Sequence, residues 1–329
     1  MPHIYLQKLV RPFLLLFISV AALGAAEKRT ALATNYATAY RIAAPQLQAR
    51  PSLVGAIRLT WSPVSGATGY VLESSNTGLP GTFVQLKTFD AAARSFRHAG
   101  LYYSQKVYYR LKAVDGNGAT ASSAIVNATT HAQGKVFNIM PLGDSNTEGG
   151  VSSQSLDVKI SYRARLAQLL DGSASKGKYD FVGSQRSGSN FATDIDHAGF
   201  GGATIQNITD LLRDRSYGET SNSEGLTYLQ EYQPDIILLH IGTNGIDGSD
   251  AEIARLEGLL NEIDKYENTS GKDVTVILAK IIKRVCYDDV FEYSYKCYSP
   301  KEAEATLIYN SKMEPMAQKR QARSEEHTS

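Results

Sequence analysis

The hydrophobic periodicity of this chain changes once, near residue 136, and the change divides it into two parts of different fold class. Between residues 50 and 130, short alternating apolar and polar runs are separated by Gly, Asn and Asp turns, with no helical period. That pattern is typical of a β-sandwich. From residue 136 onward, apolar strands alternate with amphipathic helices, as in "PDIILLHIGTN" followed by "DAEIARLEGLLNEIDKY". This alternation predicts a parallel sheet flanked by helices.

The first 26 residues predict an export signal. Lys8 and Arg11 precede an apolar stretch, Phe13–Leu23, and small residues suited to cleavage follow it. The stretch is short for a membrane span, so we expect a secreted, extracellular protein without a membrane segment after signal removal. Residues 27–48 predict an irregular tether. A net charge of +1, with both signs interspersed, offers no basic surface to a nucleic acid.

The two cysteines, Cys286 and Cys297, are compatible with a disulfide or with two free thiols. Export to an oxidising compartment favours the disulfide. The short loop that it would close gives a stabilisation of roughly 3 kcal/mol in the chain-entropy model. Two cysteines alone make no zinc site.

Residues 49–131 resemble a fibronectin type III module. The resemblance rests on "LTWSPVSGATGYVLE", which places Trp61 on an early strand, and on "VYYRLKAVDGNGATASS" near the end. It implies a seven-strand sandwich with Trp61 and one of the late tyrosines in its core. A sugar-binding platform is the alternative role for these aromatic residues. We favour packing, because buried aromatic side chains dominate protein cores. Residues 132–135 are the expected linker to the second domain.

Three polar motifs follow apolar strands of the second part, and each supplies a group that acyl transfer needs. Ser145 in "GDSNTEG" follows a strand ending at Gly143, which permits a tight bend. "HAGFGGATI" is a Gly-rich loop that can aim backbone N–H groups at developing negative charge. Asn244 in "HIGTNG" offers a side-chain amide. Because parallel strands carry ligands at their carboxyl ends, we expect these groups at one edge. The alternative for Ser145 is a cap on a following helix.

Together these motifs resemble the SGNH, or GDSL-type, hydrolase family over residues 136–322. The resemblance implies a flavodoxin-like three-layer α/β fold. It implies Ser145 as the nucleophile, with the Gly202 N–H and the Asn244 amide as oxyanion donors and Gly201 as the less favoured register. "PLGDSNTEG" and "HAGFGGATI" further resemble the carbohydrate-esterase branch that removes acetyl groups from plant polysaccharides such as xylan. The implied substrate is an acylated carbohydrate, and no metal or organic cofactor is required.

The fourth motif of that family, an Asp-x-x-His near the C-terminus, is absent from this chain, and Gly245 stands where many relatives have aspartate. Three histidines follow the nucleophile: His197 in the Gly-rich loop, His240 in an apolar strand, and His327 in "RSEEHTS". We interpret His240 as a satisfied core histidine. We expect a domain incomplete at its C-terminus, a non-native tail at 323–329, and strongly impaired catalysis. Loss of the histidine in a comparable triad costs on the order of 10⁶ in kcat.

Two other functions fit the same sequence. One is a non-catalytic protein in which the sandwich binds a polysaccharide. The other is a lipid or general esterase of the same fold, which would need a broad apolar groove, whereas the loops "SSQSLD" and "SGSNFATDID" are polar. The acyl group, the polymer and the oligomeric state stay open at this point.

Overall fold

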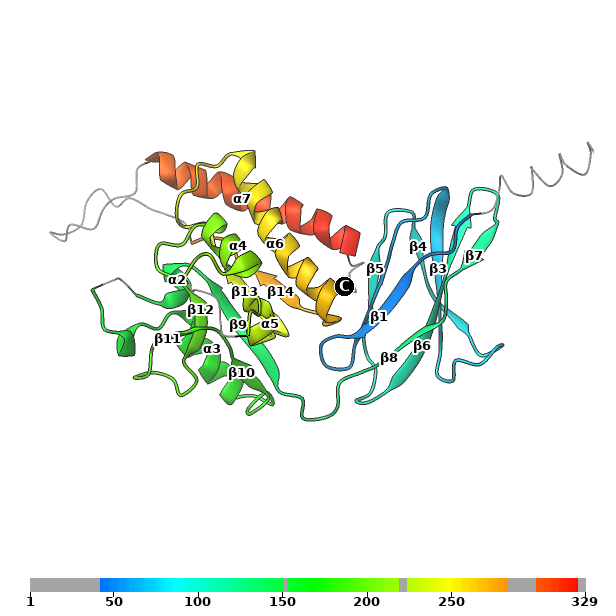
Figure 1. Ribbon diagram of the computed structural model, residues 1–329, viewed down its shortest axis with the longest axis horizontal. Coiled ribbons are helices and arrows are strands. Elements are labelled where there is room, and N and C mark those ends of the chain that lie inside the picture. The colour runs from blue at the N-terminus through cyan, green and yellow to red at the C-terminus, as the bar shows by residue number, and fades with distance from the viewer. Residues whose placement is uncertain (1–41, 151–152, 219–223, 283–299, 325–329) are drawn as a thin grey trace, which may run out of the picture.

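The computed structural model describes residues 42–150, 153–218, 224–282 and 300–324, and within them a β-sandwich precedes an α/β domain (Figure 1). The expected signal peptide, most of the tether, both cysteines and His327 lie outside these residues. Within the described ranges, none of the helices combines the length and the apolar character that crossing a bilayer requires.

The sandwich consists of two antiparallel sheets with the orders β1-β2-β5 and β4-β3-β6-β7, and β8 also pairs with β6. β7 pairs with Lys112–Val114 of β6, and β8 pairs with Lys106–Tyr109. These two short segments therefore take the place of one interrupted strand. The strands are β1 (Leu47–Pro51), β2 (Ile57–Trp61), β3 (Ala67–Ser75), β4 (Val84–Asp90), β5 (Ser95–His98), β6 (Lys106–Asp115), β7 (Thr120–Ser122) and β8 (Val126–Thr129).

Aromatic side chains fill the core of the sandwich. The ring of Trp61 lies 5.1 Å from that of Phe89 and 5.8 Å from that of Tyr70. Tyr109 is fully buried, so the expectation that Trp61 and a late tyrosine pack in the core is confirmed. β1 begins inside the expected tether, because Leu47 is buried and pairs with Trp61.

The α/β domain is built on a sheet with the order β11-β12-β9-β13-β14, and β10 also pairs with β9. All of these pairs are parallel except β11 with β12. The strands are β9 (Phe137–Gly143), β10 (Tyr179–Phe181), β11 (Gln185–Arg186), β12 (Asp196–Gly199), β13 (Ile236–His240) and β14 (Thr275–Leu278). The helices are α2 (Ser145–Glu148), η1 (Leu156–Val158), α3 (Tyr162–Asp171), α4 (Ile205–Asp214), α5 (Tyr228–Tyr232), α6 (Asp250–Ser270) and α7 (Pro300–Ser324).

Alternate residues of the central strands face opposite sides of the sheet and make three layers. Met140 and Ile237 pack with apolar residues of α4, α5, α6 and α7. Ile139 faces the other way, toward Ala167 of α3. Because both faces of β9 and β13 are covered, these strands are apolar almost throughout, as parallel strands in such sheets are.

Two helices differ from their sequence-based descriptions. The sequence predicts Leu166, Leu169 and Leu170 on one side of α3. Leu166 and Leu170 do pack against the core, but Leu169 is 54% exposed, and the fully buried positions are Arg163 and Ala167. The inward position is polar because backbone carbonyls converge on the Arg163 guanidinium. The sequence predicts a helix from Leu307 to about Gln318, whereas α7 runs from Pro300 to Ser324, into the segment that we interpret as a non-native tail.

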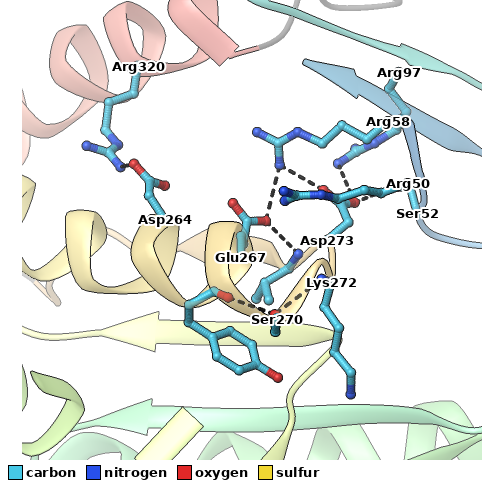
Figure 2. A network of polar contacts seen from close by, with 12 residues as sticks. Arg50, Ser52, Arg58, Arg97, Asp264, Glu267, Ser270, Lys272, Asp273 and Arg320 are labelled. Carbon is cyan, nitrogen blue, oxygen red and sulfur yellow. Dashed lines mark hydrogen bonds and ion pairs between the residues drawn. The ribbon is translucent and has the colours of Figure 1, made fainter. Parts of the chain in front are cut away.

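A polar network joins the two domains (Figure 2). Arg58 of β2 binds Asp273 at 2.9 Å and Glu267 of α6 at 3.4 Å. Ser52 also donates a hydrogen bond to Asp273, whose side chain is only 2% exposed. The sandwich therefore rests on the C-terminal end of α6, beside an interdomain cavity of about 620 Å³.

Candidate active site

The carboxyl end of β9 lies between two other strand ends. Gly143 is the register partner of Gly199 in β12 and of His240 in β13. A side chain at Gly143 would collide with the His240 carbonyl oxygen, so only glycine permits this close approach. The three loops that follow carry the predicted groups Ser145, Gly202 and Asn244. They leave the sheet at one edge, which we call the catalytic rim.

Ser145 is the first residue of α2, and Asp144 caps this helix. The buried Asp144 carboxylate accepts hydrogen bonds from the Asn146 backbone N–H at 2.9 Å and from its side-chain amide at 3.0 Å. Its other oxygen accepts from the Thr243 N–H at 3.3 Å. The alternative interpretation of Ser145 as a capping residue is therefore wrong, and the Ser145 hydroxyl is not used as a cap.

The Gly-rich segment forms a tight turn that we call the oxyanion loop, Phe200–Ala203. The Ala203 N–H donates to the Phe200 carbonyl at 3.1 Å. Gly202 has φ +79°, a conformation that favours glycine. Within the described chain, neither its N–H nor that of Ser145 donates to another residue. Both donors are therefore open to a ligand.

Asn244 joins the oxyanion loop to the loop after β13. Its side-chain amide donates to the Ala203 carbonyl at 3.0 Å, which fixes the orientation of the amide and leaves its second N–H for a ligand. The neighbouring Thr243 hydroxyl accepts from the Asn146 amide at 2.9 Å. All three loops of the catalytic rim are thus held to one another by side-chain hydrogen bonds.

His197 and His240 are both buried close to the catalytic rim. Both ring nitrogens of His197 are engaged, by the Ser187 hydroxyl and by the Gly199 N–H. Burial, together with the charges of Arg163 and Lys159, lowers the pKa of His197 to about 3. With both ring nitrogens already hydrogen-bonded and its pKa lowered, His197 is poorly suited to take the proton of a nucleophile near neutral pH.

His240 is 8% exposed, and its ring Nδ1 lies 3.9 Å from the Asp144 carboxylate. Neither ring nitrogen has a hydrogen-bond partner. Our interpretation of His240 as a core histidine is therefore confirmed, but the expectation that its ring nitrogens are hydrogen-bonded is wrong. In the described part of the chain, no histidine forms a hydrogen bond with Ser145, and no group of three or more His, Cys, Asp or Glu side chains could hold a metal ion.

The sequence offered little reason to single out Arg163, a buried residue that binds the backbone of the catalytic rim. It is 1% exposed and donates to the carbonyls of Thr147 at 3.0 Å and Glu148 at 2.9 Å, at the C-terminal end of α2. Burial lowers the pKa of its guanidinium to about 10, so it stays cationic at neutral pH. The one available signal was its spacing of four residues from the buried Ala167.

The α/β domain of this chain is similar to domains of known proteins. The family model described as GDSL-like Lipase/Acylhydrolase matches residues 139–326. A multidomain esterase of Ruminococcus flavefaciens is 34% identical over 140 residues, which cover 41% of this chain and 18% of the length of that esterase.

Two solved structures are also similar. The "Clostridium thermocellum family 3 carbohydrate esterase" is 28% identical with a TM-score of 0.37, covering 56% of this chain and 73% of that one. An "Fn3-like protein from Clostridium thermocellum" is 25% identical with a TM-score of 0.25, covering 27% of this chain and 93% of that one. The family model spans more than half of the chain and includes Ser145, Gly202 and Asn244. The chain therefore belongs to the GDSL-like lipase/acylhydrolase family.

Proposed function

We propose that this chain is a secreted serine esterase that hydrolyses acyl esters, above all acetyl esters, on carbohydrates. The convergence of Ser145, Gly202 and Asn244 at three adjacent strand ends carries the proposal. A nucleophile beside backbone and amide donors is the arrangement that acyl transfer needs. Secretion rests on the export signal in the sequence.

The nature of two surface segments favours a sugar over a lipid. Residues 153–157 and 187–196 are mostly polar and are held together by hydrogen bonds, Gly188 N–H to the Leu156 carbonyl at 2.8 Å and the Asn190 amide to Asp157 at 2.8 Å. A carbohydrate offers hydroxyl groups to such a polar surface, whereas an acyl chain needs a broad apolar groove.

In the proposed reaction, the Ser145 hydroxyl oxygen attacks the ester carbonyl carbon and gives up its proton to a base. The N–H groups of Ser145 and Gly202 and the Asn244 amide stabilise the negative charge that develops on the carbonyl oxygen. The bond to the sugar oxygen then breaks, and the base returns the proton to that oxygen. Water attacks the acyl-serine in the same way, which releases the acid and restores Ser145.

The described residues supply the nucleophile and the oxyanion donors without a histidine aligned on Ser145. We therefore propose that this chain is a slow catalyst. A site that keeps only its oxyanion donors and its binding groups retains about 10³–10⁴ over the reaction in water. A soluble base that reaches Ser145 should raise this rate.

The test is hydrolysis of 4-nitrophenyl acetate by the full chain and by its Ser145→Ala variant, each with and without added imidazole. We expect a slow Ser145-dependent rate that imidazole increases, over and above the reaction of imidazole itself with the ester. Equal rates for the two proteins in both conditions would rule out Ser145 as the nucleophile. A fast Ser145-dependent rate without imidazole would refute the proposal that catalysis is impaired, but it would support the proposed esterase activity.

The substrate class is tested on the same preparation. Release of acetate from acetylated xylan is expected to exceed hydrolysis of 4-nitrophenyl palmitate, in both cases with imidazole present. A preference for the palmitate ester would replace the carbohydrate substrate with a lipid.

A further inference from the structure

Three buried polar side chains connect the turn of the nucleophile to the oxyanion loop. Arg163 of α3 and His197 of β12 are each 1% exposed, and Ser187, directly after β11, is 3% exposed. The Ser187 hydroxyl lies 2.9 Å from Arg163 Nη2 and 2.8 Å from His197 Nε2. Burial of so many polar atoms is costly unless each one is hydrogen-bonded.

The direction of every hydrogen bond in this group is fixed. The Gly199 N–H can only donate, so His197 Nδ1, at 3.0 Å, is the unprotonated acceptor. The ring proton is then on Nε2 and is donated to the Ser187 oxygen. That oxygen accepts a second bond from Arg163, and its own proton goes to the Glu148 carbonyl at 3.3 Å. The Ser187 hydroxyl thus makes all three of its hydrogen bonds.

The two ends of this network contact two different loops of the catalytic rim, the loop of Ser145 and the loop of Gly202. At one end, Arg163 and Ser187 bind the Glu148 carbonyl, which is a terminal carbonyl of α2 without a helical partner. At the other end, His197 holds the N–H of Gly199, the last residue of β12 before the oxyanion loop. The distance between Ser145 and the oxyanion donors is therefore set partly by three side chains that are themselves buried.

We propose that His197 is a positioning residue, which holds the oxyanion loop in place relative to Ser145 through the Gly199 N–H and is itself held by Ser187 and Arg163. The proposal rests on the proposed esterase function. His197 does not exchange a proton during the reaction. Small errors in the placement of reacting groups cost up to about 10²-fold in rate.

Two substitutions separate the two bonds of His197. In His197→Asn, the amide oxygen occupies the place of Nδ1, so the bond from the Gly199 N–H remains and the bond to Ser187 is lost. In His197→Gln, the longer side chain reaches Ser187, and the acceptor for Gly199 is lost. Each variant keeps one of two hydrogen bonds in the same buried place, so a general loss of stability affects both alike.

The readout is the maximal rate of Ser145 acylation by 4-nitrophenyl acetate with imidazole present, together with the ester concentration that gives half of it. We expect His197→Gln to lower the maximal rate by about 10- to 100-fold at an unchanged half-saturating concentration. His197→Asn is expected to recover most of the loss. Amide hydrogen exchange at Gly199 is expected to be faster in His197→Gln alone. A His98→Gln variant, which loses a bond to Tyr109 in the sandwich, is the matched control.

Equal maximal rates in the two His197 variants would overturn the proposal, as would an effect confined to the half-saturating concentration. The proposal would also be overturned if the acylation rate of the parent changed with pH near neutrality and that of His197→Asn did not, because the histidine would then be the base. Absence of Ser145-dependent acylation in the parent chain is a different result, since it removes the proposed function. Exchange at Gly199 then decides alone whether His197 holds the loop.

Discussion

Replacing Glu267 with glutamine is expected to stabilise the protein above neutral pH, although it removes an ionic partner of Arg58. Burial is the main reason that the pKa of Glu267 rises from 4.5 to about 7, and the charge of Arg58 offsets this only in part. Arg58 is 2.9 Å from Asp273 and 3.4 Å from Glu267, so its better partner remains in the variant (Figure 2).

The sign and size of the effect follow from this pKa. The folded state holds the Glu267 proton more tightly than the unfolded chain does. The stability that this gives is therefore complete below pH 4.5 and is lost as pH rises through about 7. A pKa difference of about 2.5 corresponds to about 3 kcal/mol at most. Glutamine does not titrate, so the variant keeps its stability where the parent loses it.

The assay is urea unfolding at pH 5 and at pH 8. All described helices belong to the α/β domain, so the far-ultraviolet helical signal follows that domain, while the fluorescence of Trp61 follows the sandwich. Glu267→Gln is expected to match the parent at pH 5 and to exceed it at pH 8. Glu314→Gln, which changes an exposed carboxylate paired with Lys280, is the control and is expected to bring no gain. A Glu267→Gln variant less stable than the parent at pH 8 would refute the reasoning, because the ion pair with Arg58 would then outweigh the cost of burial.

Two further predictions concern the catalytic rim. Asn244→Ala is expected to lower the maximal acylation rate by about 10²–10³-fold with little change in half-saturation, as loss of one oxyanion donor does; an unchanged rate in the assay with 4-nitrophenyl acetate would remove Asn244 from the site. Gly143→Ala is expected to lower the free energy of unfolding by about 1–3 kcal/mol or more, because its methyl group meets the His240 carbonyl. Parental stability of that variant in urea would contradict the close strand approach.

The helices and strands whose residues follow a periodic hydrophobic pattern could be predicted from the sequence. Alternating residues gave the strands around Trp61, and apolar residues spaced three and four apart gave α6, where Leu256, Leu259, Leu260 and Ile263 are buried. The meeting of the three site motifs at one edge also followed from the sequence, because the carboxyl ends of parallel strands share an edge.

Buried polar residues could not be predicted in the same way. Arg163 lies in a helix with ordinary amphipathic composition, and most of its carbonyl partners come from segments distant in sequence. Glu267 and Arg58 look like surface charges until the two domains pack together. The sequence shows that residue 197 is a histidine, but it does not show that the Gly199 N–H and the Ser187 hydroxyl occupy its two ring nitrogens. In each case the role of the side chain depends on its hydrogen-bond and ionic partners, which the sequence does not show.

The proposed oxyanion donors stand on a scaffold that does not depend on the base. The Gly143 position is fixed by pairing with β12 and β13, the oxyanion loop by Gly199 and Asn244, and α2 by carbonyl contacts with Arg163. None of these bonds involves a group that must gain or lose the Ser145 proton. Electrostatic preorganisation is separable from proton transfer, and it is often the larger contribution to catalysis. A soluble base therefore has a formed site to act on, and this is why rescue by imidazole is expected to require Ser145 and to respond to the bond between His197 and Gly199.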